Sequence, residues 1–484
     1  MFRWQRFLIL VLFACGVGLT AEVPAPAGGE AAATRRARQV FAELNAGPVA
    51  DYSKFILRAT TDEMRAKHGM EGLNSFLQEL ATLLGQSELT RKLAEPVIWQ
   101  DGWAMDMFNA AGEPRQFYVR LGPAPDYRID GLGVTTRPLD TPPIMRIPIA
   151  ELPMMVDIYL SNLTASDGFS GAVVIAKNGK QLFGKAYGAA DRAAGRKNTL
   201  DTPFNLGSMN KMFTAIAVGL LVQQKKLSLD DTVGKILPDY PNEEVRQKVT
   251  VQQLLAHRAG IPSYWNDTYF DTKDSLKSIA DFVSAFSHLP LEFEPGSEYR
   301  YSNGGPVILG LMIEKLSGES YYEFVRNHVY RPAGMTHSDH YAKDDKKAGF
   351  AVGYERKQAS DPWKPNSEFL GRIGSPAGGG YASANDLVRF ADALLKNLLV
   401  NARTRDELWQ EQTKIRDDFG YASLFGVGTI NGHRWVGHNG GAPGVSVDLR
   451  IYPETGYAVI VLSNHGGVAG DLSNWVNRMI AEAI

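Results

Sequence analysis

The sequence predicts an α+β protein with two domains behind a leader segment. At 484 residues the chain is longer than most single compact domains. Helical apolar periodicity over residues 34–47 and 71–84 is followed by several strand-like runs, an order typical of a small α+β unit. A strand, a tight turn and a second strand over 168–187 then precede an apolar helical pattern that begins near Ser208.

The first 21 residues have the pattern of a signal peptide. Two arginines precede an apolar run that ends at Cys15, and a cleavage site follows at Ala21. We therefore expect a secreted or periplasmic protein whose mature chain has no transmembrane span. A lipoprotein-like box also ends at Cys15, but Phe13 is bulky where small residues are usual, which favours cleavage over a lipid anchor.

Composition excludes several classes of site. The net charge of −2 shows no footprint for nucleic-acid binding. Because Cys15 is the only cysteine, a chain cut after Ala21 has no disulfide, no thiolate nucleophile and no cysteine–zinc site. The contents of 44% hydrophobic and 21% charged residues are ordinary for a globular protein, and they leave its oligomeric state open.

Composition and hydrophobic pattern divide the remaining chain into two linkers and two domains. Residues 22–33 are rich in Ala, Pro and Gly, which indicates a flexible linker. Residues 34–140 form the small α+β domain, whose last strand-like run, 127–135, resembles nuclear-transport-factor-2-like domains. A proline-containing linker over 141–150 leads to a larger domain over 151–484. The small domain is either a packing or dimerisation module or a ligand-binding pocket.

The most informative stretch is Ser208-Met209-Asn210-Lys211, which begins the apolar helical pattern. Residues three apart share one face of a helix, so the amine of Lys211 can reach the hydroxyl of Ser208. A lysine kept neutral in a dry pocket can take the serine proton and so produce a nucleophile. The start of a helix also offers N–H groups to an oxyanion. A capping serine beside a solvated lysine has the same spacing, however.

Two further motifs, Tyr301-x-Asn303 and His438-x-Gly440, follow in the chain. The order Ser-x-x-Lys, Tyr-x-Asn and Lys/His-x-Gly resembles the serine β-lactamase and penicillin-binding-protein family. The Tyr-x-Asn form is similar to class C β-lactamases, D-alanyl-D-alanine carboxypeptidases, D-aminopeptidases and β-lactamase-fold esterases. The other stretches that carry the resemblance are 168–187, 254–262, 375–381 and 457–464.

This resemblance covers roughly residues 150–484 and implies the fold of the larger domain. The expected fold is a β-lactamase/transpeptidase-like α+β domain, in which helices flank an antiparallel sheet and a helical subdomain carries Ser208 at the interface. The run 457–464 fits a buried strand, and the final segment, 472–484, fits a helix that packs on the sheet.

The resemblance also implies acyl transfer through a covalent intermediate on Ser208, without a metal or organic cofactor. Lys211 and Tyr301 would share the proton transfers, and which of them is the base in each step stays open because they titrate as a coupled pair. The oxyanion hole would consist of the backbone N–H groups of Ser208 and Gly441. The expected substrate-binding residues are Asn303, His438, Gly440 and Gly441.

His438 stands where many β-lactamases place lysine. A histidine is mostly neutral above about pH 6.5, so we expect a weak anchor for anionic substrates. This favours esters or D-amino-acid peptides over efficient β-lactam hydrolysis, although His438 is alternatively a structural histidine. We interpret His257 as structural. The loop over 262–270 is dense in aromatic residues, which either recognise an apolar acyl group or anchor the loop.

A different class of protein has the same three motifs. A non-turnover penicillin-binding or sensor-type protein is acylated by cell-wall peptides or β-lactams and does not release the product. The presence of Tyr301 favours an enzyme that turns over. The sequence does not separate esters, D-peptides and lactams as substrates.

Overall fold

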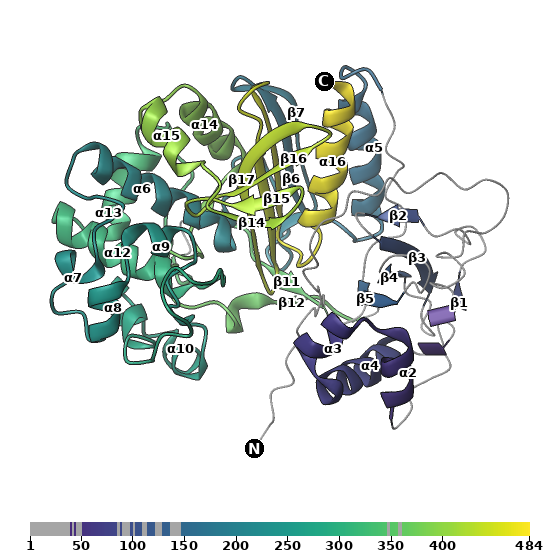
Figure 1. Cartoon of the computed structure of the whole chain (residues 1–484). Helices are drawn as coiled ribbons and strands as arrows, with labels where there is room; N and C mark the ends of the chain where they lie inside the picture. Colours follow the sequence, from purple (N-terminus) through teal and green to yellow (C-terminus); the bar gives the residue numbers. More distant parts are fainter. Residues whose placement is uncertain are drawn as a thin grey trace. The chain divides into compact units, whose positions relative to one another are not determined.

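The chain forms two compact units, Met1–Thr141 and Pro142–Ile484 (Figure 1). The computed structural model describes residues 39–40, 43–44, 51–84, 88–89, 97–99, 102–108, 114–121, 128–135, 147–345, 349–356 and 361–484. The predicted signal peptide over 1–21 and the linker over 22–33 lie outside these residues. Over the described ranges, no helix has both the length and the apolar character needed to cross a membrane.

The first unit places helices before strands, as its sequence predicts. The helices are α2 (Ser53–Ala59), α3 (Asp62–His68) and α4 (Met70–Leu84). The strands are β1 (Glu88–Leu89), β2 (Val97–Trp99), β3 (Gly102–Phe108), β4 (Pro114–Leu121) and β5 (Ile129–Thr135). They form an antiparallel sheet in the order β1-β3-β4-β5, with β2 paired to β3. The side chain of Thr61 accepts a hydrogen bond from the Met64 N–H, which begins α3.

The second unit is built on an antiparallel sheet of eight strands in the order β14-β15-β16-β17-β18-β19-β6-β7. These strands are β6 (Gly171–Lys177), β7 (Lys180–Tyr187), β14 (Thr413–Arg416), β15 (Phe419–Tyr421), β16 (Gly426–Ile430), β17 (His433–Ala442), β18 (Val445–Ile451) and β19 (Tyr457–Ser463). All of β19 is buried because helices cover both faces of the sheet. The expected β-lactamase-like α+β architecture is therefore confirmed.

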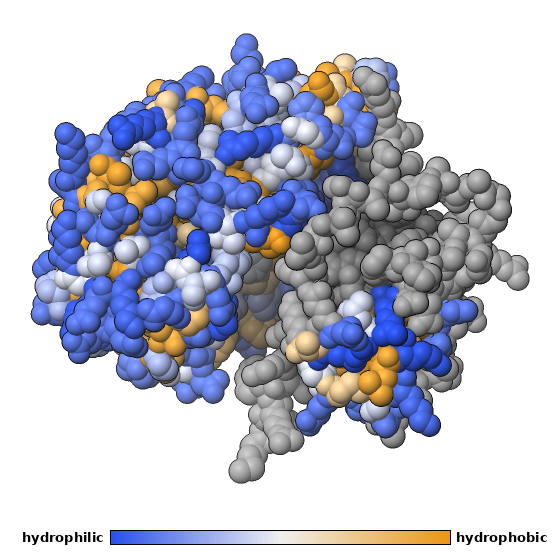
Figure 2. All heavy atoms as spheres, viewed as in Figure 1, coloured by the Kyte–Doolittle hydropathy of each residue, from blue (hydrophilic) through white to orange (hydrophobic). Residues whose placement is uncertain are grey.

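Two helices cover one face of this sheet, α5 (Leu152–Ala165) and α16 (Ala469–Ala483) (Figure 1). Their buried side chains, among them Leu160, Trp475 and Ile480, pack against β6 and β19. The last helix thus includes the segment predicted to end the domain on the sheet. On the surface that Figure 2 shows, the described residues are largely hydrophilic, with apolar side chains in scattered groups.

The opposite face carries the helical subdomain (Figure 1). Its helices are α6 (Lys211–Gln223), α7 (Val233–Ile236), α8 (Glu243–Lys248), α9 (Val251–Leu255), α10 (Asp267–Thr272), α11 (Ile279–Ser284), α12 (Gly304–Ser317), α13 (Tyr321–Val325), α14 (Ala384–Leu395) and α15 (Ala402–Leu408). Single turns are η2 (Gly207–Asn210), η3 (Arg326–Tyr330) and η4 (Asn366–Glu368). Short strand pairs join β8 (Ala189–Asp191) to β9 (Arg196–Lys197), β10 (Phe204–Asn205) to β13 (Tyr381–Ala382), and β11 (Tyr354–Glu355) to β12 (Lys364–Pro365).

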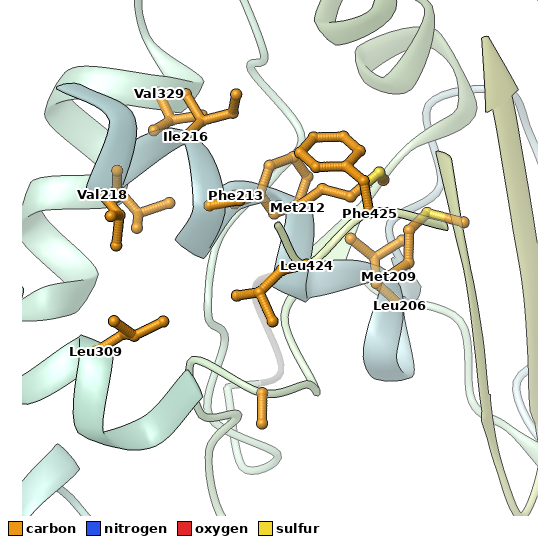
Figure 3. Packing of buried hydrophobic residues seen from close by; sticks show 14 of the residues in the cluster. Leu206, Met209, Met212, Phe213, Ile216, Val218, Leu309, Val329, Leu424 and Phe425 are labelled. Atoms are coloured by element: carbon orange, nitrogen blue, oxygen red, sulfur yellow. The ribbon is translucent and has the colours of Figure 1, made fainter. Parts of the chain in front are cut away.

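Helix α6 runs through the centre of the core, and its residues are buried on nearly every side. Figure 3 shows Met212, Phe213 and Ile216 of this helix in one apolar cluster with Leu424 and Phe425. Each fully buried side chain of this size stabilises the fold by about 1.5–3 kcal/mol. The core therefore holds η2, which carries Ser208, and the start of α6, which carries Lys211, in a fixed place.

Candidate active site

Ser208 lies in η2, a single 3-10 turn that continues directly into α6 at Lys211. The sequence predicts that Ser208 opens the α-helix itself, so the structure delays the α-helix by one tight turn. Within this turn Gly207 adopts φ +48°, which glycine tolerates, and donates its N–H to the side chain of Asn205, 2.9 Å away. Ser208 and Lys211 nevertheless remain on one side of the chain.

Lys211 is completely buried, and its side-chain nitrogen has three polar neighbours. Nζ lies 3.1 Å from Ser208 Oγ, 2.8 Å from Asn303 Oδ1 and 2.5 Å from the Ala377 carbonyl oxygen. The Thr214 hydroxyl, one turn later on α6, accepts from the Tyr321 hydroxyl over 2.7 Å and donates to the Pro376 carbonyl over 2.7 Å. This contact holds the carbonyl-bearing segment against α6.

Burial holds the pKa of Lys211 well below its usual value of 10.5. A neutral amine has two N–H groups and one lone pair. The side-chain oxygen of Asn303 and the Ala377 carbonyl can only accept, so they take both N–H groups. The lone pair is then left for the hydroxyl of Ser208, which is the arrangement that a general base requires.

Tyr301 and Asn303 come from the loop that leads into α12. Asn303 is the N-cap residue of this helix, but its side chain binds Lys211 instead of capping. The Tyr301 ring lies 4.8 Å from Lys211 Nζ. Tyr301 exposes 39% of its surface, yet the burial of its hydroxyl among site groups raises its pKa, and a hydrogen bond with the Ser208 side chain opposes the rise. Tyr301 is therefore protonated at neutral pH.

The backbones that would form the oxyanion hole approach each other closely. A Cβ on Gly207 would lie 2.9 Å from the Gly441 nitrogen, and a Cβ on Gly440 would collide with the Leu206 carbonyl oxygen. Only glycine permits this contact between η2 and β17. Gly441 also lines the same pocket as Ser208. Ser208 and Gly441 therefore lie at one pocket, and the oxyanion hole formed by their N–H groups stays a prediction.

His438 does not line this pocket. It is buried, with Nε2 2.8 Å from the Tyr421 hydroxyl and Nδ1 2.5 Å from the Asn439 carbonyl oxygen. Burial lowers its pKa to about 3. Both ring nitrogens are occupied by the protein and the ring is neutral, so its placement favours the structural alternative over a contact with an anionic substrate.

Two side chains beside these residues have no motif to mark them. Tyr421 ends β15 and contacts His438, and His257 follows α9 with its ring 4.3 Å from that of Tyr301 between centroids. His257 is in the phrase that supports the family resemblance, but its residue type alone does not indicate a place in the site. Tyr421 had no sequence signal.

The pocket around Ser208 has a cavity volume of about 130 Å³, and several aromatic side chains are among the residues that line it. Residues 262–270 contribute Tyr264, Trp265 and Tyr269, and the segment after η4 contributes Phe369. The predicted loop is only partly a loop, since α10 begins at Asp267. The Tyr264 hydroxyl lies 2.9 Å from Ser375 Oγ, so this loop both lines the pocket and is anchored. Across the described part of the chain, no group of three His, Cys, Asp or Glu side chains is placed to hold a metal ion.

Comparison with known proteins gives the same family as the three sequence motifs. The family described as Beta-lactamase matches residues 157–482. The putative penicillin-binding protein PbpX of Bacillus subtilis is 29% identical over 327 residues, which are 66% of this chain and 78% of that protein. The structure of a penicillin binding protein from Bacillus halodurans is 31% identical, with a TM-score of 0.61 over 66% of this chain and 98% of that chain. The D-amino acid amidase from Ochrobactrum anthropi SV3 shares the fold, with 24% identity and a TM-score of 0.58 over 69% of this chain and 97% of that chain. Because the family match spans well over half of its residues, this chain belongs to the Beta-lactamase family.

Proposed function

We propose that this protein is an exported serine hydrolase that forms an acyl-enzyme on Ser208. Its substrates are esters or D-amino-acid peptides, and its β-lactamase activity is weak or absent. The observation that carries this proposal is the position of the buried Lys211 Nζ, 3.1 Å from Ser208 Oγ, with two fixed acceptors on its other side. Export rests on the signal-peptide pattern of residues 1–21.

In the first step the neutral amine of Lys211 takes the proton of Ser208 while Oγ attacks the substrate carbonyl. The negative charge develops on the carbonyl oxygen, which the N–H groups of Ser208 and Gly441 would bind. The proton then passes to the leaving group through the Tyr301 hydroxyl, which is hydrogen-bonded to Ser208. In the second step water attacks the acyl-enzyme, and the same groups transfer the protons in the opposite direction, which releases the acid and restores the serine.

This assignment of the base follows from the two pKa shifts. Burial raises the pKa of Tyr301, and a neutral Lys211 supplies no positive charge to lower it again. A phenol in this state donates and relays a proton but does not withdraw one at neutral pH. The buried lysine, whose pKa is lowered, suits the role of base instead.

The lining of the pocket supports an apolar acyl group. Its volume of about 130 Å³ is close to the ~150 Å³ of an apolar protein cavity that holds benzene. Trp265 and Phe369 lie on its walls and are 44% and 42% exposed, so a bound apolar group would cover them. Since His438 is neutral and turned toward Tyr421, it offers no cation to the carboxylate of a β-lactam.

The test is the Ser208→Ala variant with a series of p-nitrophenyl esters of increasing acyl length. We expect turnover to fall by roughly 10⁴-fold or more, since removal of a catalytic nucleophile in other serine hydrolases has costs of this size. The thermal unfolding midpoint should stay close to that of the wild type. Activity that survives this substitution would remove the proposed function.

Intact-mass measurement separates the enzyme from the alternative function. The protein is mixed with an activated ester and, separately, with a β-lactam. A transient adduct on Ser208 that decays as product appears is expected for a hydrolase. A permanent adduct without turnover would instead favour a non-turnover penicillin-binding or sensor-type protein.

A further inference from the structure

Behind Tyr301, four hydrogen bonds join groups from four segments of the catalytic unit. The Ser302 N–H donates to His257 Nδ1 over 3.3 Å, and His257 Nε2 lies 3.1 Å from the Tyr421 hydroxyl. This hydroxyl lies 2.8 Å from His438 Nε2, and His438 Nδ1 lies 2.5 Å from the Asn439 carbonyl oxygen. We call His257, Tyr421 and His438 the buried relay, since each exposes 6% or less of its surface.

The two ends of the buried relay determine the direction of every hydrogen bond in it. A backbone N–H can only donate, so His257 Nδ1 accepts and its proton is on Nε2, where it is donated to Tyr421. A carbonyl can only accept, so the proton of His438 is on Nδ1 and its Nε2 accepts from the Tyr421 hydroxyl. Both rings are neutral, because burial holds the pKa of each histidine below its usual range.

The buried relay forms the support of Tyr301. The His257 ring packs against the Tyr301 ring with centroids 4.3 Å apart, and the Tyr421 ring meets it edge-on at 6.2 Å. The backbone of His257 holds the same loop, because its carbonyl accepts from the Arg300 N–H over 2.9 Å. His257 keeps φ +55°, a conformation that costs energy for a residue other than glycine. This loop would therefore move if the relay loosened.

We propose that Tyr421 is a positioning residue that joins the two histidines, holds Tyr301 at Ser208 and keeps His438 out of the substrate cleft. In this proposal His438 acts through Tyr421 and does not bind the substrate. The proposal rests on the proposed function of Ser208, since it assigns a part in that same reaction. It predicts that loss of the Tyr421 hydroxyl lowers the rate of proton transfer and leaves substrate binding nearly unchanged.

The first test compares Tyr421→Phe with Tyr299→Phe. Tyr299 flanks the same histidine, with ring centroids 6.3 Å from His257 and 5.8 Å from Tyr421, but it does not join the relay. We expect Tyr421→Phe to lower kcat for a neutral ester about ten-fold, within the ~100-fold that a misplacement near 1 Å can cost. KM should change by less than about two-fold because uniform binding is kept. Tyr299→Phe should behave as the wild type.

A second pair of variants separates positioning from substrate binding and serves if Tyr421→Phe does not fold. His438→Gln keeps an acceptor for Tyr421 and a donor for the Asn439 carbonyl, whereas His438→Leu keeps neither. A relay role predicts a smaller loss of kcat in His438→Gln than in His438→Leu, with similar KM in both. A loss confined to KM in both variants would show that His438 binds the substrate and would overturn the proposal.

Nitrogen-15 NMR of the histidine rings tests the relay in the unmodified protein. We expect the Nε2–H tautomer for His257 and the Nδ1–H tautomer for His438, with no protonation of either ring between about pH 5 and 8. The opposite tautomer in either ring would contradict the relay. If Ser208→Ala retains activity, the proposed function fails; if Ser208→Ala is inactive but Tyr421→Phe equals Tyr299→Phe, only the positioning proposal fails.

Discussion

The two sides of the cleft are built by different forces. The hydrogen-bonded wall consists of Ser208 and Asn303, which line the pocket, and of Lys211 and Tyr301, which are hydrogen-bonded to them. At its centre Lys211 is fully buried with three polar neighbours. The aromatic wall consists of Tyr264, Trp265, Tyr269 and Phe369, which line the pocket. The ring of Tyr269 packs against those of Tyr264 and Trp265. On this wall Trp265 is 44% exposed.

Because of this difference, we expect one wall to determine the rate of the reaction and the other to determine which substrates are preferred. On the hydrogen-bonded wall the two N–H groups of the buried Lys211 each have one acceptor, so loss of a single group leaves a buried partner unsatisfied and changes the chemistry. The aromatic wall is non-directional, and its contribution scales with the apolar area that a substrate covers. Substitutions on the first wall should therefore change kcat for all substrates, and substitutions on the second should change the order of preference among them.

The largest effect after loss of the nucleophile is expected for Lys211→Met. The variant fills the same space without a base, so kcat/KM should fall by roughly 10²–10⁴-fold for every ester in the series. Lys414→Met, which loses only an exposed ion pair with Asp417, is the control and should retain full activity. A loss that affected long acyl esters alone would break the division between the two walls.

The lowered pKa of Lys211 should also affect how the free energy of unfolding depends on pH. Its pKa is lowered in the folded state and close to 10.5 when unfolded, so the unfolded chain binds more protons between these two values. The free energy of unfolding of the wild type should rise with pH in this window by about 1.4 kcal/mol per unit relative to Lys211→Met. Parallel stability curves for the two proteins would show that Lys211 is charged in the fold.

The next effect concerns the backbone contact between η2 and β17. Gly207→Ala places a Cβ 2.9 Å from the Gly441 nitrogen, so the two N–H groups of the oxyanion hole must separate. We expect kcat to fall by roughly 10²–10³-fold, the cost of one lost oxyanion donor. Gly195→Ala is a matched control, because Gly195 also has positive φ, +65°, but no atom within 4 Å of the added Cβ. Equal losses in both variants would refute this reading.

The sequence predicted the two walls to very different extents. Ser208, Lys211 and Asn303 lie in short motifs, because their chemistry requires particular residue types at particular spacings. The third neighbour of Lys211, the Ala377 carbonyl, has no such signal, since every residue has a carbonyl. Tyr421 also had none, because its role depends on the pairing of β15 and β17 in one sheet and not on a neighbour in sequence.

His438 illustrates the limit of a motif. Its position in the chain was visible, but the direction of its ring is set by Tyr421 on another strand and by the carbonyl of Asn439. The fold was easier to predict than the direction of this ring, since many residues contribute to the pattern of buried strands and helices. Single hydrogen bonds between distant segments have no such redundancy.

A smaller effect is expected on the aromatic wall. Trp265 and Phe270 are both 44% exposed and adjacent, but only Trp265 lines the pocket. Trp265→Ala should lower kcat/KM for long or aromatic acyl esters about ten-fold and leave acetate esters nearly unchanged, because only the larger groups reach the lost ring. Phe270→Ala should change neither. If both variants lost activity equally, the loop would act as a structural support and not as a binding surface.

In the last prediction, the preference for a charged over a neutral substrate stays constant with pH. It tests whether the hydrogen-bonded wall recognises the charge of a substrate. Because the pKa of His438 lies at about 3, its ring stays neutral at any pH near 7. The ratio of kcat/KM for a carboxylate-bearing β-lactam to that for a neutral ester should then change by less than about two-fold between pH 6 and 8. A histidine that faced the substrate with an ordinary pKa near 6.5 would gain charge over this range and raise the ratio at pH 6 several-fold. Such a rise would mean that His438 turns toward the cleft in the working enzyme, and the hydrogen-bonded wall would then recognise charge as well as carry out the chemistry.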